Sequence, residues 1–297
     1  MIHINTLSKK FSGFDGFSAK SILFTFFLFL ATAFFSCKEI GPNIILSNNG
    51  NDTTSQQKTV LMEDFTATDC ANCPKARNDI DNLLASHPGR IEVVEVHEGL
   101  LSHPLLPGDS ALKTPDGELL ATLLGSPPYW PIGAVDRKAY EISPGNFQVL
   151  IDRGLWPTYV PQELDSALKV KLGLNLNYDG ASRQLTGSVT VDFLETITYP
   201  LNITLLITES GIVAGQMDGL VLVSNYVHND VLRDIITNYQ GESVPAGVTT
   251  QGNTWTYPLA AYSVSTNWNA DSCRIIAFVS KAQGGYDVLQ AIGKPLN

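Results

Sequence analysis

EDFTATDCANCPKA, residues 63–76, joins a strand pattern to a helix pattern through a CxxC motif. The residues before the motif are apolar enough for a buried strand, and the residues after it carry apolar side chains at three- and four-residue steps. Pro74 suits the first helical turn, where its missing N–H is not needed, and Pro88-Gly89 ends the helix. IEVVEVHEG, residues 91–99, then predicts a second strand. The sequence therefore predicts a β-α-β unit with Cys70 and Cys73 at the start of its helix.

This placement of the two cysteines suits dithiol redox chemistry. Free N–H groups at a helix start stabilise a thiolate and lower its pKa, so Cys70 is the candidate nucleophile. Cys73, one turn away, would resolve the mixed disulfide, which makes the chain a candidate thiol–disulfide oxidoreductase. The alternative is an inert disulfide clip in a binding protein. Exposure separates the two interpretations, because a reactive Cys70 must be partly open whereas a clip can be covered.

The region around the motif resembles thioredoxin-like proteins. The resemblance implies that Asp64, six residues before Cys70, is a buried acid that moves protons at the second cysteine. Trp130-Pro131-Ile132 is similar to the segment that carries the family's cis-proline, which lies against the disulfide and helps to hold the substrate backbone. Pro127 and Pro128 compete for that assignment. The catalytic set that the resemblance implies is therefore Cys70, Cys73, Asp64 and Pro131.

Further along the chain the hydrophobic period changes. A short helix is expected in ELLATLLG and another around residues 146–167, and from Leu168 apolar and polar residues alternate, as in half-buried strands. CRIIAFVS, residues 273–280, is apolar enough for a strand covered on both faces. The stretch 224–241 is expected to be a loop with a short helix. We therefore predict a two-domain α+β protein, with a thioredoxin-like α/β domain at 59–165 and an all-β antiparallel sandwich at 166–297.

The N-terminus is typical of an exported protein. Three lysines precede an unbroken apolar run from Ser21 to Ser36, which is the pattern of a secretion signal. The run ends at Cys37, and this resembles the lipobox of bacterial lipoproteins, which implies cleavage after residue 36 and lipidation of Cys37. An uncleaved signal anchor is the alternative. Residues 37–58 are polar and predict a flexible tether between lipid and fold.

Composition limits the partners. The first 36 residues hold three lysines and one aspartate, so their removal changes the formal net charge from −10 to −12. Such acidity argues against nucleic acid as a partner. We expect a membrane, contacted through the lipid, and envelope or surface proteins instead. With Cys37 lipidated and Cys70 paired with Cys73, Cys273 is left over and is expected to be a buried thiol.

No metal ligand or cofactor is assigned from the sequence. A structural zinc site needs four ligands, and the chain has a single CxxC. His97 and His103 are expected to be a strand-end residue and a loop residue. His228 is expected to be a hydrogen-bonded loop histidine.

The mature chain also resembles the twenty-eight-kilodalton outer-membrane protein (Omp) family of lipoproteins. The resemblance rests on the FTxxxCxNCP-type stretch, on YVHNDVLR at Tyr226–Arg233 and on VLQA at Val288–Ala291. It implies an outer-membrane location, with the protein held by its lipid on either face. The expected function is thiol–disulfide exchange on envelope proteins, and the alternative is a non-enzymatic surface-binding module whose CxxC is structural.

Overall fold

The computed structural model describes residues 56–297. The predicted signal peptide 1–36, Cys37 and most of the predicted tether 37–58 lie outside these residues. Within them, no helix combines the length and the apolar character needed to cross a membrane.

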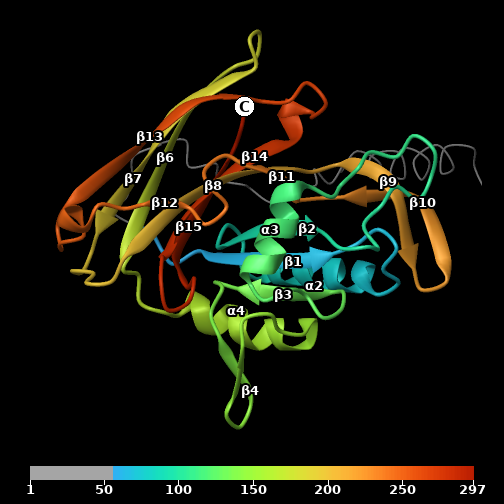
Figure 1. The fold of residues 1–297 in the computed structure, drawn as a ribbon, viewed down its shortest axis with the longest axis horizontal. Coiled ribbons are helices and arrows are strands. Elements are labelled where there is room, and N and C mark those ends of the chain that lie inside the picture. The colour runs from blue at the N-terminus through green and yellow to red at the C-terminus, as the bar shows by residue number, and fades with distance from the viewer. Residues whose placement is uncertain (1–55) are drawn as a thin grey trace, which may run out of the picture. The chain divides into compact units, whose positions relative to one another are not determined.

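The first part of the fold is the predicted β-α-β unit. β1 (Val60–Thr66) leads through the CxxC loop into α2 (Cys73–Ser86), and β2 (Ile91–His97) returns parallel to β1. β3 (Ile132–Val135) pairs antiparallel with the other edge of β1. The thioredoxin-like mixed sheet with CxxC at a helix start is therefore confirmed (Figure 1).

Later strands extend the same sheet beyond β2. β11 (Val231–Ile235) pairs with β2 through Val231 and Glu95, and then β8 (Leu201–Glu209), β14 (Cys273–Lys281) and β15 (Val288–Pro295) follow antiparallel. The order is β15-β14-β8-β11-β2-β1-β3, with β12 (Glu242–Ser243) beside β8. One sheet thus runs through segments on both sides of residue 165.

Alternating side chains give this sheet two faces. On one face Phe65, Val94, Leu206 and Phe278 form a core with α3 (Pro115–Leu123). On the other face, β1 and β2 pack against α2 and α4 (Trp156–Leu164) through residues such as Met62, Ile80 and Trp156. The strand at 273–280, predicted to be covered on both faces, is confirmed, because Phe278 belongs to the first core and Val279 to another.

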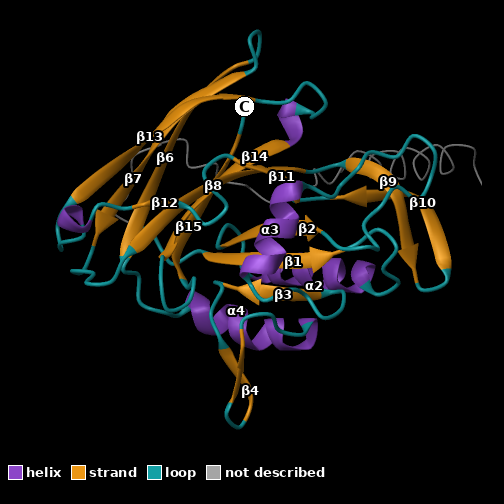
Figure 2. Cartoon of the chain, viewed as in Figure 1, coloured by secondary structure: helices purple, strands orange, loops and turns teal. Residues whose placement is uncertain are grey.

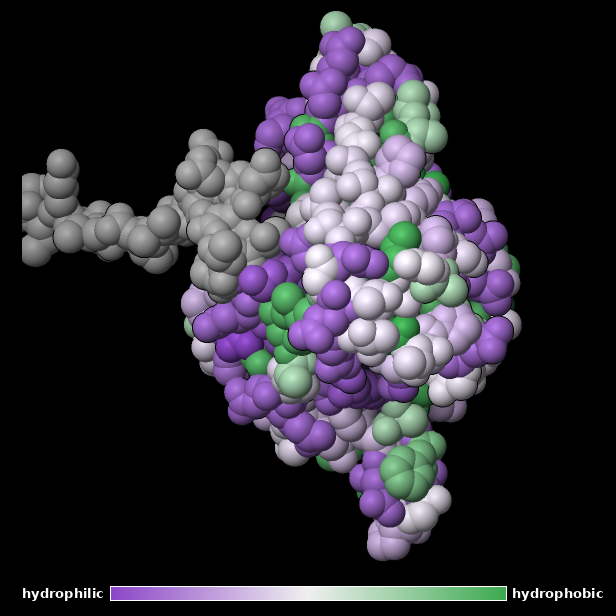
Figure 3. Space-filling model, turned by 90° about the vertical axis from the view of Figure 1, so that its left-hand side faces the viewer, coloured by the Kyte–Doolittle hydropathy of each residue, from purple (hydrophilic) through white to green (hydrophobic). Residues whose placement is uncertain are grey.

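A separate three-stranded antiparallel sheet supplies that other core. It consists of β6 (Val170–Asp179), β7 (Gln184–Phe193) and β13 (Thr254–Ser263). Its inward residues, such as Leu172 and Val191, pack against Ile203 of β8 and Ile275 of β14. The antiparallel strands expected after residue 166 are present, and they pack as two layers (Figure 2). The side formed by β6, β7 and β13 is mostly polar or neutral, with isolated apolar patches (Figure 3).

One expectation about local structure is wrong, and another is correct only in part. The stretch 224–241 contains no helix and instead holds the end of β10 (Val221–His228), which pairs with β9 (Ile212–Asp218), and then β11. Residues 146–167 contain the expected α-helix only from Trp156, after a 3-10 turn at Arg153–Leu155, because β5 (Asn146–Gln148) first pairs with β4 (Tyr140–Ser143). In both cases pairing with another strand outweighs the local pattern. The short helix expected in ELLATLLG is present as α3.

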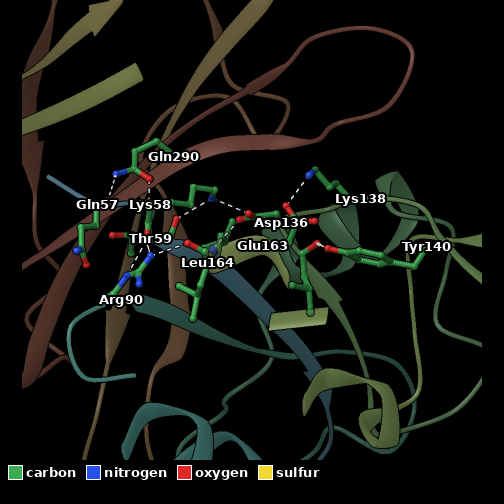
Figure 4. Close-up of polar contacts among 12 residues, drawn as sticks. Gln57, Lys58, Thr59, Arg90, Asp136, Lys138, Tyr140, Glu163, Leu164 and Gln290 are labelled. Carbon is green, nitrogen blue, oxygen red and sulfur yellow. Dashed lines mark hydrogen bonds and ion pairs between the residues drawn. The ribbon is translucent and has the colours of Figure 1, made fainter. Parts of the chain in front are cut away.

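The expectation that residues 59–165 and residues 166–297 fold as separate domains stays a prediction. Lys58, expected to belong to the tether, is buried and forms an ion pair with Asp136 at 2.6 Å. Gln290 of β15 accepts a hydrogen bond from the Thr59 backbone N–H and donates one to the Gln57 carbonyl (Figure 4). Polar contacts therefore connect the first described residues to the last strand.

Candidate functional site

Cys70 and Cys73 form a disulfide just beyond the C-terminal end of β1. Their Cα atoms are 5.4 Å apart, and Cys73 begins α2 with Pro74 directly after it. The Cys73 backbone N–H donates to the Cys70 carbonyl at 3.2 Å, so the two cysteines close a tight turn into the helix. Both residues are 4% exposed. The pair predicted from the motif is therefore present, and it is largely covered.

Asp64 lies on the sheet face that α2 covers. It follows Met62 by two residues on β1, and Met62 packs against the helix, so alternation directs the Asp64 side chain to the same side. The carboxyl is 1% exposed, and its Oδ1 has no hydrogen-bond partner among the described residues. Burial, followed by the negative charge of Glu95, holds the pKa of the Asp64 carboxyl well above its usual range, while Arg77 opposes the shift. The structure thus keeps an unpartnered carboxyl behind the helix that Cys73 begins.

Trp130 and Leu101 pack against the cluster of Ala67, Cys70 and Cys73. The Trp130–Pro131 bond is cis, and no other cis bond occurs among residues 56–297. The Trp130 indole N–H donates to the Glu98 carboxylate, and its ring lies against Gly99, where any Cβ would collide with it. Gly99 also has a φ of 72°, so both space and backbone conformation require glycine. The two apolar side chains form a rim on one side of the disulfide.

The hairpin of β9 and β10 covers the CxxC loop from another side. The Met217 N–H donates to the Thr68 carbonyl and the Gly219 N–H to the Ala71 carbonyl, each at 2.9 Å. The buried Gln216 side chain donates to the carbonyls of Ala67 and Cys70, each at 3.2 Å. Four hydrogen bonds therefore hold the loop to a segment about 146 residues further along the chain.

The tip of this hairpin is apolar and exposed. Leu220 is 99% and Val221 63% exposed, and Leu222 follows with 42%. The sequence analysis missed the hairpin as a partner of the CxxC loop. Asp218-Gly219 between two apolar runs is a hairpin signal that could have located its turn.

A cluster of polar side chains lies beside Asp64 on the α2 face. Arg77 of α2 pairs with Glu95 at 3.2 Å, with Asp230 at 2.8 Å and with Asp81 at 2.6 Å. His97, two residues after Glu95 on β2, lies next to His228, and their ring centroids are 5.3 Å apart. His228 is the last residue of β10 rather than a loop residue. The sequence did not predict that these residues meet, since they come from distant segments.

The remaining predicted residues lie elsewhere. Cys273 is a buried free thiol at the start of β14, and burial raises its pKa to about 12. It packs in the core between the two sheets, as expected for a thiol that acts as a small apolar side chain. His103 is an exposed loop residue, as predicted.

Comparison with known proteins gives a family match and a structural match. Residues 130–295, more than half of the chain, match the family model described as outer membrane protein Omp28. The structure is similar to that of HBP35 of Porphyromonas gingivalis, with a TM-score of 0.64 and 18% sequence identity over 82% of this chain and 76% of that one. A protein of Agrobacterium tumefaciens matches with a TM-score of 0.49 and 14% identity, over 82% of this chain and 97% of that one. No curated protein matches the chain.

Proposed function

Because the chain belongs to the Omp28 family of outer membrane proteins and carries a CxxC disulfide in a thioredoxin-like sheet, we propose that it performs thiol–disulfide exchange on proteins of the cell envelope. The observation that carries this proposal is the buried Asp64 carboxyl on the sheet face covered by α2, the helix that Cys73 begins. An unpartnered buried carboxyl costs stability, on the order of 1–3 kcal/mol for such a group. A structural clip has no use for it, whereas a resolving cysteine needs a proton acceptor.

The proposed reaction starts from the reduced pair. The Cys70 thiolate attacks one sulfur of a substrate disulfide, forms a mixed disulfide and releases the other substrate sulfur, which takes up a proton. Cys73 gives its proton to Asp64 and attacks the Cys70 sulfur, which releases the second substrate thiol. The pair loses two electrons, and the substrate disulfide gains them. A dithiol reductant restores the pair for the next cycle.

The two sides of the disulfide have different roles in this proposal. Trp130 and Leu101 offer an apolar rim for the substrate, and Pro131 is the residue that we expect to lie along the substrate backbone. The hairpin of β9 and β10 holds the loop from another side. Since each cysteine is 4% exposed, exchange requires that the loop or the hairpin moves.

The second candidate function is a surface-binding module with a structural disulfide. The low exposure of Cys70 and the four hydrogen bonds from the hairpin favour it. In that case the disulfide keeps the loop in the shape that the hairpin accepts, and it never exchanges. Turnover separates the two candidates.

We expect the protein to catalyse the reduction of a disulfide-linked fluorogenic peptide by dithiothreitol, with a rate proportional to protein concentration. Cys70→Ser is expected to lower the rate to the uncatalysed level, because no other cysteine has its position at the turn. Cys273→Ser is the matched control and is expected to keep the full rate. An uncatalysed rate with the wild-type protein would contradict the proposal and favour the structural clip.

The proposal places the protein at the outer membrane through a lipid on Cys37, with the signal peptide 1–36 removed. We expect labelled palmitate to enter the wild-type protein in cells and Cys37→Ser to leave an unlabelled precursor of higher mass. Cys273→Ser is expected to be labelled like the wild type. Absence of label from the wild type would contradict lipidation of Cys37.

A further inference from the structure

Three side chains that commonly bind metals meet beneath the hairpin. Glu95 and His97 are two residues apart on β2, so they point to the same face of the sheet. His228 reaches them from the end of β10. One ligand atom from each of the three lies within 4.8 Å of the other two. The residues are 5%, 2% and 2% exposed, so the cluster is inside the protein.

The imidazoles lack the partners that buried polar groups normally have. Both ring nitrogens of His97 and Nε2 of His228 have no hydrogen-bond partner among residues 56–297. Most buried polar atoms are satisfied, so three orphaned nitrogens in one place need an explanation. A buried ring nitrogen without a hydrogen-bond partner is free to bind an ion.

The charges around the cluster favour a cation. Arg77 alone faces the carboxylates of Glu95, Asp81 and Asp230, so this group carries more negative than positive charge. Arg233, which also acts on His97, is itself paired with Glu209 at 3.3 Å. A bound divalent ion would offset the excess negative charge of the first group.

We propose that Glu95, His97 and His228 bind a divalent transition-metal ion, with zinc as the best match. Two imidazoles and one carboxylate are a ligand set that zinc accepts at about 2.0–2.2 Å, with a fourth position left open. Ligand atoms around such an ion are about 3–3.5 Å apart, so small side-chain rotations bring these three into place. The site revises the sequence assignment, which gave the protein no metal ligand.

The site has a structural consequence for the disulfide, independent of whether the disulfide exchanges. β10 supplies His228, and its partner β9 holds the CxxC loop through Gln216 and Met217. An ion shared with β2 would therefore fasten the hairpin that covers Cys70. Binding of the ion is therefore expected to keep the hairpin more firmly over the cysteine pair.

Metal binding can be measured on the purified protein with its disulfide intact. After treatment with a chelator, calorimetric titration with Zn²⁺ is expected to show one ion per chain, and Co²⁺ is expected to give the visible bands of a four-coordinate site. At a free zinc concentration one hundred times Kd, the melting temperature is expected to rise by about 5–10 °C.

The matched variants are His97→Ala and His228→Ala against His103→Ala, which removes an exposed histidine. The first two substitutions are expected to weaken zinc binding by more than about 100-fold, which exceeds the loss of affinity when only a residue that supports a ligand is removed. His103→Ala is expected to leave zinc binding unchanged. Melting in chelator checks that each variant folds. Absence of stoichiometric Zn²⁺ binding and of the Co²⁺ bands in the wild type would overturn the proposal. So would retention of wild-type affinity by folded His97→Ala and His228→Ala.

Discussion

Replacement of Cys73 by serine is expected to turn the protein from a catalyst into a trap. Cys70 keeps its position before α2 and still attacks a disulfide, but no second thiol resolves the product. Mixed with the disulfide-linked peptide, Cys73→Ser is therefore expected to accumulate a nearly stoichiometric adduct on Cys70, which intact mass and peptide mapping measure. Dithiothreitol is expected to release the adduct.

Cys70→Ser is the matched variant, because it leaves one cysteine in the same turn. Cys73 is the first residue of α2 and is the resolving thiol in the proposed reaction, so it is expected to form little adduct under the same conditions. A structural clip makes a different prediction, since neither remaining cysteine would then be activated. Equal and slow adduct formation by both variants would contradict the assignment of Cys70 as the nucleophile.

The sequence predicted the half of the fold whose signals are local. The strand before Cys70, the proline in the first turn of α2 and the proline-glycine stop after it are all short-range features, and the β-α-β unit is confirmed. The extension of the sheet was not predicted. It depends on Val231 meeting Glu95 and on β8 pairing with β11 and β14, and such long-range pairings leave no trace in the local hydrophobic period.

The same distinction holds for the site. The motif located Cys70 and Cys73, and the resemblance to thioredoxin-like proteins implied the buried position of Asp64. The cover of the loop by Gln216 and the meeting of His97 with His228 could not be predicted, because each joins residues far apart in the chain. His228, expected in a loop, is instead the last residue of β10, and the turn residues Asn229 and Asp230 follow it.

Two opposing constraints act on the CxxC loop. Trp130 and Leu101 border the disulfide where a substrate would approach, and the hairpin holds the loop on another side. Once the pair is reduced, the reactivity of Cys70 also depends on how well its thiolate is stabilised. The free N–H groups at the start of a helix such as α2 favour a nearby thiolate. Asp69 is exposed, so its opposing charge is screened over about 8 Å at physiological salt.

The most direct measurement is the alkylation rate of Cys70 in the reduced protein across a pH series, resolved by peptide mass spectrometry and with Cys273 replaced by serine. We expect Cys70 to react faster than Cys73 throughout, with an apparent pKa below the value of about 8.5 for a free cysteine, because the helix start stabilises its thiolate. A chelator is present, so that a bound metal does not restrain the hairpin. A single slow phase for both cysteines, with an ordinary thiol pKa at Cys70, would contradict the exchange function and leave the disulfide as a structural clip.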